Sequence, residues 1–184
     1  MLGLPDALGY CRSLAVLDLS YNDIAELPVS LSGLKALTDL SAAHNRLHEL
    51  SGKIFTFTTA LKSLNASFNA LREVNGSLYT LRRLAVLDLS HNGIEELDGK
   101  LGALVNLSSL KIAFNAIREL PPEVAALKVG PLLLHECIHY RHPYSCSCHR
   151  GCVLFIGPGD AGSGGQRYRR AAFRAVVPAQ GRLG

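Results

Sequence analysis

Cysteine is nearly absent from the first two thirds of this 184-residue chain, where Cys11 stands alone before residue 129. That part therefore holds no disulfide framework, which favours a reducing compartment. The N-terminus lacks a basic start followed by a long apolar core, so no signal peptide is expected. No uninterrupted apolar run approaches the length of a membrane span. Together these absences predict a cytoplasmic protein that does not bind a membrane.

An excess of one charge is also missing from residues 1–128, which carry 12 Lys or Arg and 13 Asp or Glu, a balance of −1. Residues 129–184 differ, because they carry seven Arg, no Lys and two acidic residues, a balance of +5. The net charge of +4 therefore describes neither part. A nearly neutral body gives no electrostatic reason to expect nucleic-acid binding.

What the sequence does contain is a frame that returns about every 23 residues. LAVLDLSYN at residues 14–22 comes back as LAVLDLSHN at residues 84–92. Self-similarity at this period indicates a solenoid. The full units are residues 14–36, 37–60, 61–83, 84–106 and 107–129, of which the second has 24 residues, and residues 1–13 fit the second half of a unit.

The frame LxxLxLxxNxIxxLPxxLxxLxx resembles the leucine-rich repeat, and the resemblance covers about two thirds of the chain. It is similar to the 23-residue intracellular type found in Ras-suppressor and scaffold proteins. The resemblance implies an α/β fold, a right-handed solenoid whose concave face is lined by a parallel sheet. Pro28, Pro121 and several glycines oppose regular helices on the convex side, so irregular turns and 3-10 segments are expected there.

Apolar residues alternate along one short segment of each unit, which is strand periodicity. We expect these strands to stack in parallel about 4.8 Å apart and to bury one continuous apolar row. The row contains Leu17, Leu40, Leu64, Leu87 and Leu110. Ala42 and Ala66 replace leucine two residues further on, so the second and third units are expected to be the softest.

Asparagine recurs where each unit leaves its strand and turns. An amide carries both donors and an acceptor, so it can satisfy turn backbone groups that have no strand partner. We predict a buried structural ladder that joins one coil to the next, the alternative being ordinary turn asparagines. Its members are Asn22, Asn45, Asn69, Asn92 and Asn115.

Side chains that alternate with the core leucines face outward and are free to bind a partner. The predicted partner-binding residues are Asp18, Ser41, Asn65, Asp88 and Lys111, together with the ring-bearing Tyr21, His44, Phe68, His91 and Phe114. Exposed rings in a contiguous patch usually mark an interaction site. Alternatively, these rings cover the edge of the sheet and pack on one another. We expect a monomer that binds an unidentified protein partner.

Catalytic groups do not converge in this frame. His44 and His91 lie two units apart, roughly 10 Å in a stacked sheet, which is too far for one metal ion. Neither histidine is placed to activate a Cys or Ser nucleophile. Asp18 and Asp88 lie three units apart and cannot act as paired carboxylates. We therefore predict no enzymatic activity, no metal site and no cofactor.

After Leu127 the frame fails, and residues 130–184 form a segment of different composition. Eight Cys and His residues lie between positions 135 and 152, without the usual spacing of a zinc finger. The glycine-rich residues 157–165 lack the Lys-Ser/Thr ending of a phosphate loop. Little apolar surface is available beyond them, so the tail is predicted to be disordered.

These patterns predict a protein–protein interaction module or adaptor in intracellular signalling. Two alternatives stay open. The repeats could be the recognition part of a larger enzyme, such as a kinase or a ubiquitin ligase, since a fold does not fix a function. The Cys- and His-containing tail could also bind zinc beside a repeat that acts as a spacer.

Overall fold

The computed structural model describes residues 4–127, 132–134 and 152–154 of the chain. The zinc alternative and the predicted disorder beyond Gly157 fall almost entirely on the other residues, and so they remain hypotheses. The predicted division into residues 1–129 and 130–184 also remains a hypothesis.

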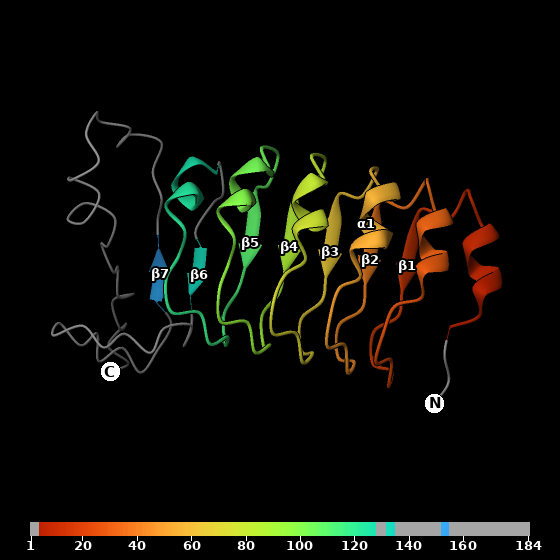
Figure 1. Ribbon diagram of the computed structural model, residues 1–184, viewed down its shortest axis with the longest axis horizontal. Coiled ribbons are helices and arrows are strands. Elements are labelled where there is room, and N and C mark those ends of the chain that lie inside the picture. The colour runs from red at the N-terminus through yellow and green to blue at the C-terminus, as the bar shows by residue number, and fades with distance from the viewer. Residues whose placement is uncertain (1–3, 128–131, 135–151, 155–184) are drawn as a thin grey trace, which may run out of the picture.

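One short strand in each repeat unit builds a parallel sheet whose strands follow the order of the chain (Figure 1). These strands are β1 (Val16–Asp18), β2 (Asp39–Ser41), β3 (Ser63–Asn65), β4 (Val86–Asp88) and β5 (Ser109–Lys111). Their register aligns the five core leucines in one row, so that prediction is confirmed. Leu40, Leu64, Leu87 and Leu110 are at most 2% exposed, whereas Leu17 in the outermost strand is only partly buried.

Two further strands extend the sheet beyond β5. β6 (Leu132–Leu134) is parallel to β5, with Leu133 opposite Lys111, and β7 (Cys152–Leu154) is antiparallel to β6. Both lie in the segment that the sequence assigns to a tail predicted to be disordered, and that prediction remains untested. An uncovered β5 would leave a row of unpaired backbone groups, and β6 pairs with them.

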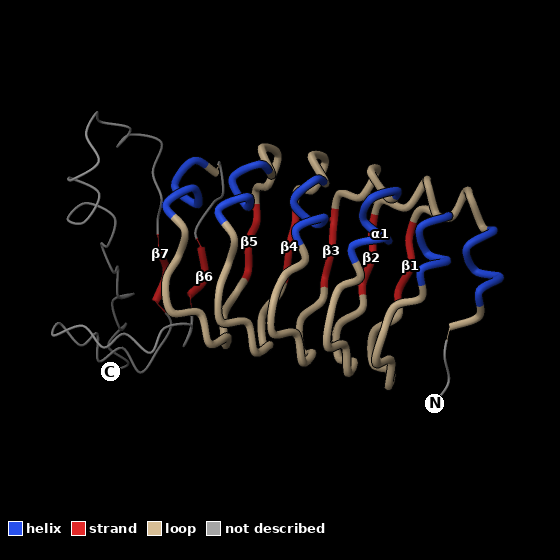
Figure 2. The backbone as a smooth tube through the Cα atoms, viewed as in Figure 1, coloured by secondary structure: helices blue, strands red, loops and turns tan. Residues whose placement is uncertain are grey.

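Short helical turns cover the opposite side of the solenoid (Figure 2). They are the 3-10 helices η1 (Asp6–Tyr10), η2 (Val29–Gly33), η3 (Gly76–Thr80), η4 (Gly99–Ala103) and η5 (Pro122–Ala126), and the α-helix α1 (Gly52–Phe57). This confirms the expected 3-10 character of the convex side. The one α-helix among the described residues belongs to the 24-residue unit, where the extra residue completes a turn that buries both Ile54 and Phe55 at 0% exposure.

Glycine allows the first two helical turns to touch backbone to backbone. A Cβ atom added at Gly33 would overlap the carbonyl oxygen of Gly9, and one added at Gly9 would overlap the carbonyl oxygen of Ser30. Neighbouring coils can approach this closely only where no side chain intervenes. The glycines therefore fix the spacing of η1 and η2.

The asparagines lie inside the turns, and each interior one makes the same set of hydrogen bonds. Asn69 shows the pattern: its Nδ2 donates to the carbonyls of Ala66 and Ser67 in its own coil and of Ala42 in the preceding coil, at 2.9 to 3.2 Å. Its Oδ1 accepts from the backbone N–H of Leu47 at 2.9 Å. One side chain thus satisfies four backbone groups in two coils.

Asn45, Asn92 and Asn115 repeat this arrangement, with Oδ1 accepting from Ile24, Leu71 and Ile94 in turn. Asn22 differs, because its Nδ2 donates only to two carbonyls of its own coil and its side chain is exposed. The ladder therefore joins each coil to the one before it. Asn22 makes no such bond, because no strand precedes β1 among the described residues.

Candidate binding surface

The concave face carries the outward-pointing side chains of β1 to β5 in rows that cross the strands. Equivalent residues of neighbouring strands lie opposite one another. The first row contains Val16, Asp39, Ser63, Val86 and Ser109. The second row contains Asp18, Ser41, Asn65, Asp88 and Lys111, which are the predicted binding residues without rings. The structure therefore brings those five residues into one line.

Hydrogen bonds fix the side chains of the second row at the end of each strand. Asp18 Oδ1 accepts from the backbone N–H of Ser20 at 2.9 Å, and Asp88 Oδ1 accepts from that of Ser90 at 3.0 Å. Hydrogen bonds from Ser20, through its side chain and then its backbone N–H, hold the pKa of Asp18 below its usual value. Asp18 is thus a carboxylate at neutral pH, held in a defined orientation.

A column of five stacked rings borders these rows. It consists of Tyr21, His44, Phe68, His91 and Phe114, and we call it the ring column. Successive ring centroids are 4.3, 4.1, 3.9 and 4.1 Å apart, and neighbouring ring planes are inclined by no more than 16°. The rings therefore do pack on one another, as the alternative interpretation expects. Yet the ring column also presents an open surface, because Tyr21 is 78% and Phe68 42% exposed.

All five ring residues have a left-handed backbone, with φ between 53° and 58°. This conformation costs roughly 1–2 kcal/mol per residue with a Cβ atom. Stacking of neighbouring rings offsets about 0.5–1.5 kcal/mol of this conformational cost per pair of rings. The turn also places backbone donors well: the N–H of His44 donates to the carbonyl of Ser67 at 3.0 Å, and that of Phe68 to Ser90 at 2.9 Å. Sequence reasoning missed this feature, because aromatic residues rarely adopt a positive φ and so give no signal for it.

The left-handed backbone predicts that glycine is more stable than alanine at position 68, which is the reverse of their usual order. Both Phe68→Ala and Phe68→Gly remove two stacking contacts, but only glycine relieves the left-handed strain. We expect Phe68→Gly to be more stable than Phe68→Ala by about 1 kcal/mol in urea denaturation. At the nearby exposed Ala70, whose φ is not positive, Ala70→Gly should instead destabilise by roughly 0.5–1 kcal/mol. Finding alanine better than glycine at position 68 would contradict the strain argument.

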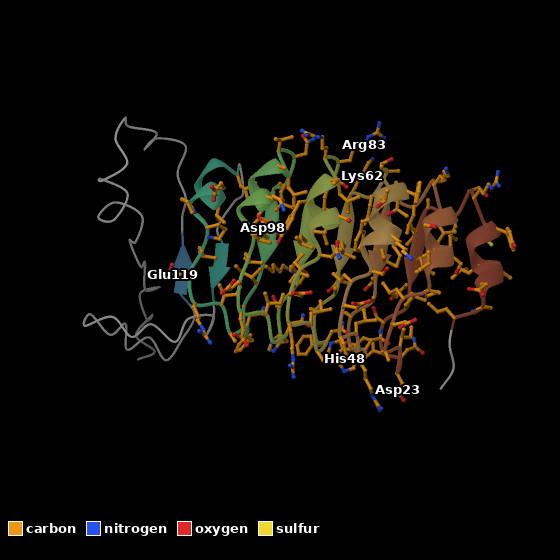
Figure 3. The ribbon with its side chains drawn as sticks, in the orientation of Figure 1. Asp23, His48, Lys62, Arg83, Asp98 and Glu119 are labelled. Carbon is orange, nitrogen blue, oxygen red and sulfur yellow. The ribbon has the colours of Figure 1, made fainter. Side chains whose placement is uncertain are left out.

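Some polar and charged side chains outside the rows lie at the two rims of the solenoid. Figure 3 shows Lys62 and Arg83 toward one rim and Asp23 and His48 toward the other. Among the described residues of the two rows, one ion pair is present, and it joins Lys111 Nζ to Asp88 Oδ2 at 3.4 Å. The concave face therefore lies between polar rims and has its own charge pattern.

The ring column also separates the two histidines, since Phe68 stacks between His44 and His91. No group of three or more His, Cys, Asp or Glu side chains within the described residues is placed to hold a metal ion. Among the same residues, no helix has the length and apolar character needed to cross a bilayer. The concave face presents two rows of side chains and the ring column, and such an extended face suits contact with the surface of another molecule.

Comparison with protein families supports this architecture. A family model described as "Leucine rich repeat" matches residues 42–94, and a second one described in the same way matches residues 10–25. Residues 10–25 and 42–94 are therefore similar to leucine-rich repeats. The protein Tsukushi of Mus musculus is 42% identical over 53 residues, which are 29% of this chain and 15% of Tsukushi.

Solved structures agree with the fold. A leucine-rich repeat protein of Leptospira interrogans has a TM-score of 0.68 at 27% identity, covering 71% of this chain and 33% of its own. An internalin of Listeria monocytogenes has a TM-score of 0.64 at 23% identity over 72% of this chain and 38% of its own, and supports the fold alone. The structure of PEPR1–AtPEP1 has a TM-score of 0.63 at 27% identity over 68% of this chain and 18% of its own. This chain thus spans well under half the length of each.

Proposed function

We propose that this chain is a non-enzymatic protein-binding module, which recognises a partner protein through the concave face. In this proposal the chain acts as a monomeric cytoplasmic adaptor in intracellular signalling, with repeats of the 23-residue intracellular type. The support from the comparisons is that leucine-rich repeats commonly serve as binding scaffolds, and that the PEPR1 neighbour was solved together with AtPEP1. The finer role does not follow from those neighbours, because this chain spans only a part of each.

The observation that carries the proposal is a continuous surface built from a few exposed apolar groups among small ones. Val16 is 62% and Val86 37% exposed on the first row, and the ring column adds Tyr21 and Phe68. Between the second row and the ring column lie small residues such as Ser67 and Ser90, whose buried side chains do not obstruct a partner. Rigid rings beside small side chains suit protein recognition.

A charge placed in the middle of the concave face should abolish binding without affecting folding. We expect Val86→Glu to weaken capture of partner proteins from a cell extract by about tenfold or more, because the glutamate would have to be buried unpaired. Val105→Glu is the matched control, since Val105 is 55% exposed and lies outside the strands. The measurement is quantitative mass spectrometry of the captured proteins, alongside thermal melts of both variants. Equal capture by the wild type and by Val86→Glu would overturn the proposed function.

A further inference from the structure

Charge is unevenly distributed over the concave face. At one end of the two rows, Asp18 and Asp39 form no ion pair with any residue that the structure describes. At the other end, the carboxylate of Asp88 is paired with Lys111. The β1–β2 end is therefore negative, and the β4–β5 end is balanced.

The two unpaired carboxylates are close enough to act on one cationic side chain. Asp39 lies opposite Val16 and Asp18 lies opposite Ser41, so the two aspartates are diagonal neighbours on adjacent strands. A strand spacing of about 4.8 Å and a rise of about 3.3 Å per residue place such Cα atoms roughly 8 Å apart, with both side chains on the same face. Val16, at 62% exposure, lies directly beside them and can cover the methylene stem of an arginine or lysine.

The ring column favours different side chains of a partner from those that the two aspartates favour. Each interior ring has both faces covered by its neighbours, so the ring column presents ring edges to solvent. Ring edges carry the positive part of the aromatic quadrupole, which favours the face of another ring or an apolar group over a cation. Cations should therefore go to Asp18 and Asp39, and apolar groups to the ring column near Phe68.

We propose that the concave face binds an extended, basic segment of a partner protein. In this arrangement an arginine or lysine lies over Asp18 and Asp39, and an apolar or aromatic side chain packs on the ring column near Phe68. The segment runs across the strands, because the rows and the ring column both do. This inference rests on the proposed function and adds the chemistry and the polarity of the partner.

The attraction must be local, since the chain as a whole cannot supply it. The net charge is +4 for the whole chain and −1 for residues 1–128, so a basic partner gains little from either total. Lys62, just before β3, is exposed and forms no ion pair with either aspartate. Glu26 and Glu49 are also exposed and carry the same charge as the aspartates, but they lie outside the strands. They provide a matched pair for a control.

The test is selection of a displayed library of random ten-residue peptides on the full chain. We expect the selected peptides to be enriched in arginine and lysine. Binding of a selected peptide should weaken by about tenfold or more in Asp18→Lys/Asp39→Lys, because two like charges would face the cation. The milder Asp18→Asn/Asp39→Asn, which keeps the hydrogen-bond acceptor for Ser20, should weaken it by about threefold. Glu26→Lys/Glu49→Lys, with the same change in net charge, should stay within about twofold.

Several results would overturn this inference. They are selected peptides without basic residues, equal losses in the two lysine variants, or no selected peptide at all. A further contrary result is a dimer of the chain in sedimentation that Asp18→Lys/Asp39→Lys converts to a monomer, because the occupant would then be a second copy. If non-basic peptides bind and Val86→Glu abolishes their binding, the proposed function stands and only the basic partner is wrong.

Discussion

Phe55→Ala is expected to lower the free energy of unfolding by about 3–5 kcal/mol, the usual cost of emptying a buried phenylalanine site. Phe55 is fully buried and is the largest of the completely enclosed side chains. It lies in α1, between the helical turns η2 and η3 of the neighbouring coils, which both contact α1. The rest of the coil cannot collapse into the gap, because these neighbours hold it in place.

Phe57→Ala provides the matched control for this prediction. Phe57 lies two residues further along the same helix, but it is 54% exposed, and the ammonium of Lys35 lies 5.9 Å from the centroid of its ring. Its loss should cost less than about 1 kcal/mol. Chemical denaturation of the two variants and the wild type gives the comparison. Similar losses for the two positions would mean that the packing of α1 is not as described.

Asn69→Ala is expected to destabilise the chain by about 3 kcal/mol. The substitution leaves the backbone N–H of Leu47 without its partner, and a buried polar group left alone costs about 1–3 kcal/mol. It also removes one of the two donors to each of three carbonyls, those of Ala42, Ala66 and Ser67, so the loss lies at the upper end of that range. The measurement is urea denaturation followed by circular dichroism, with the slope compared to exclude a change in cooperativity.

Asn22→Ala separates the ladder from an ordinary turn. Asn22 is exposed and donates only to two carbonyls of its own coil, so its removal should cost about 1 kcal/mol or less. The same substitution thus has two expected sizes at equivalent positions of the repeat. If Asn22 and Asn69 gave equal losses, the bonds between coils would contribute no more than those within one coil.

The repeat made the strands and the core row predictable, because five units agree at the same offsets. The sequence alone predicted that Leu64 and Leu87 lie in the core and that Asn69 lies in a turn. The second unit was harder, since its extra residue left Ile54 and Phe55 as competing core positions. The structure resolves the choice by forming an α-helix that buries both.

Backbone conformation and end effects were not accessible from the sequence. The positive φ of the ring residues depends on hydrogen bonds from each turn to the next coil, and residue type alone gives no hint of them. The strands β6 and β7 follow a point where the leucine frame has ended, so periodicity could not indicate them. The predicted binding residues do share one face, but the pairing of Asp88 with Lys111 became evident only from strand register.

The direction of the asparagine bonds has a consequence for synthesis of the chain. Asn45 closes the turn that contains Ile24, and Asn69 closes the turn that contains Leu47, so each coil is completed by the one that follows it. During translation a coil that has just left the ribosome therefore still has open backbone donors and acceptors. It reaches its final form only when roughly one more repeat has emerged. Folding of each coil therefore follows its synthesis by about one repeat unit.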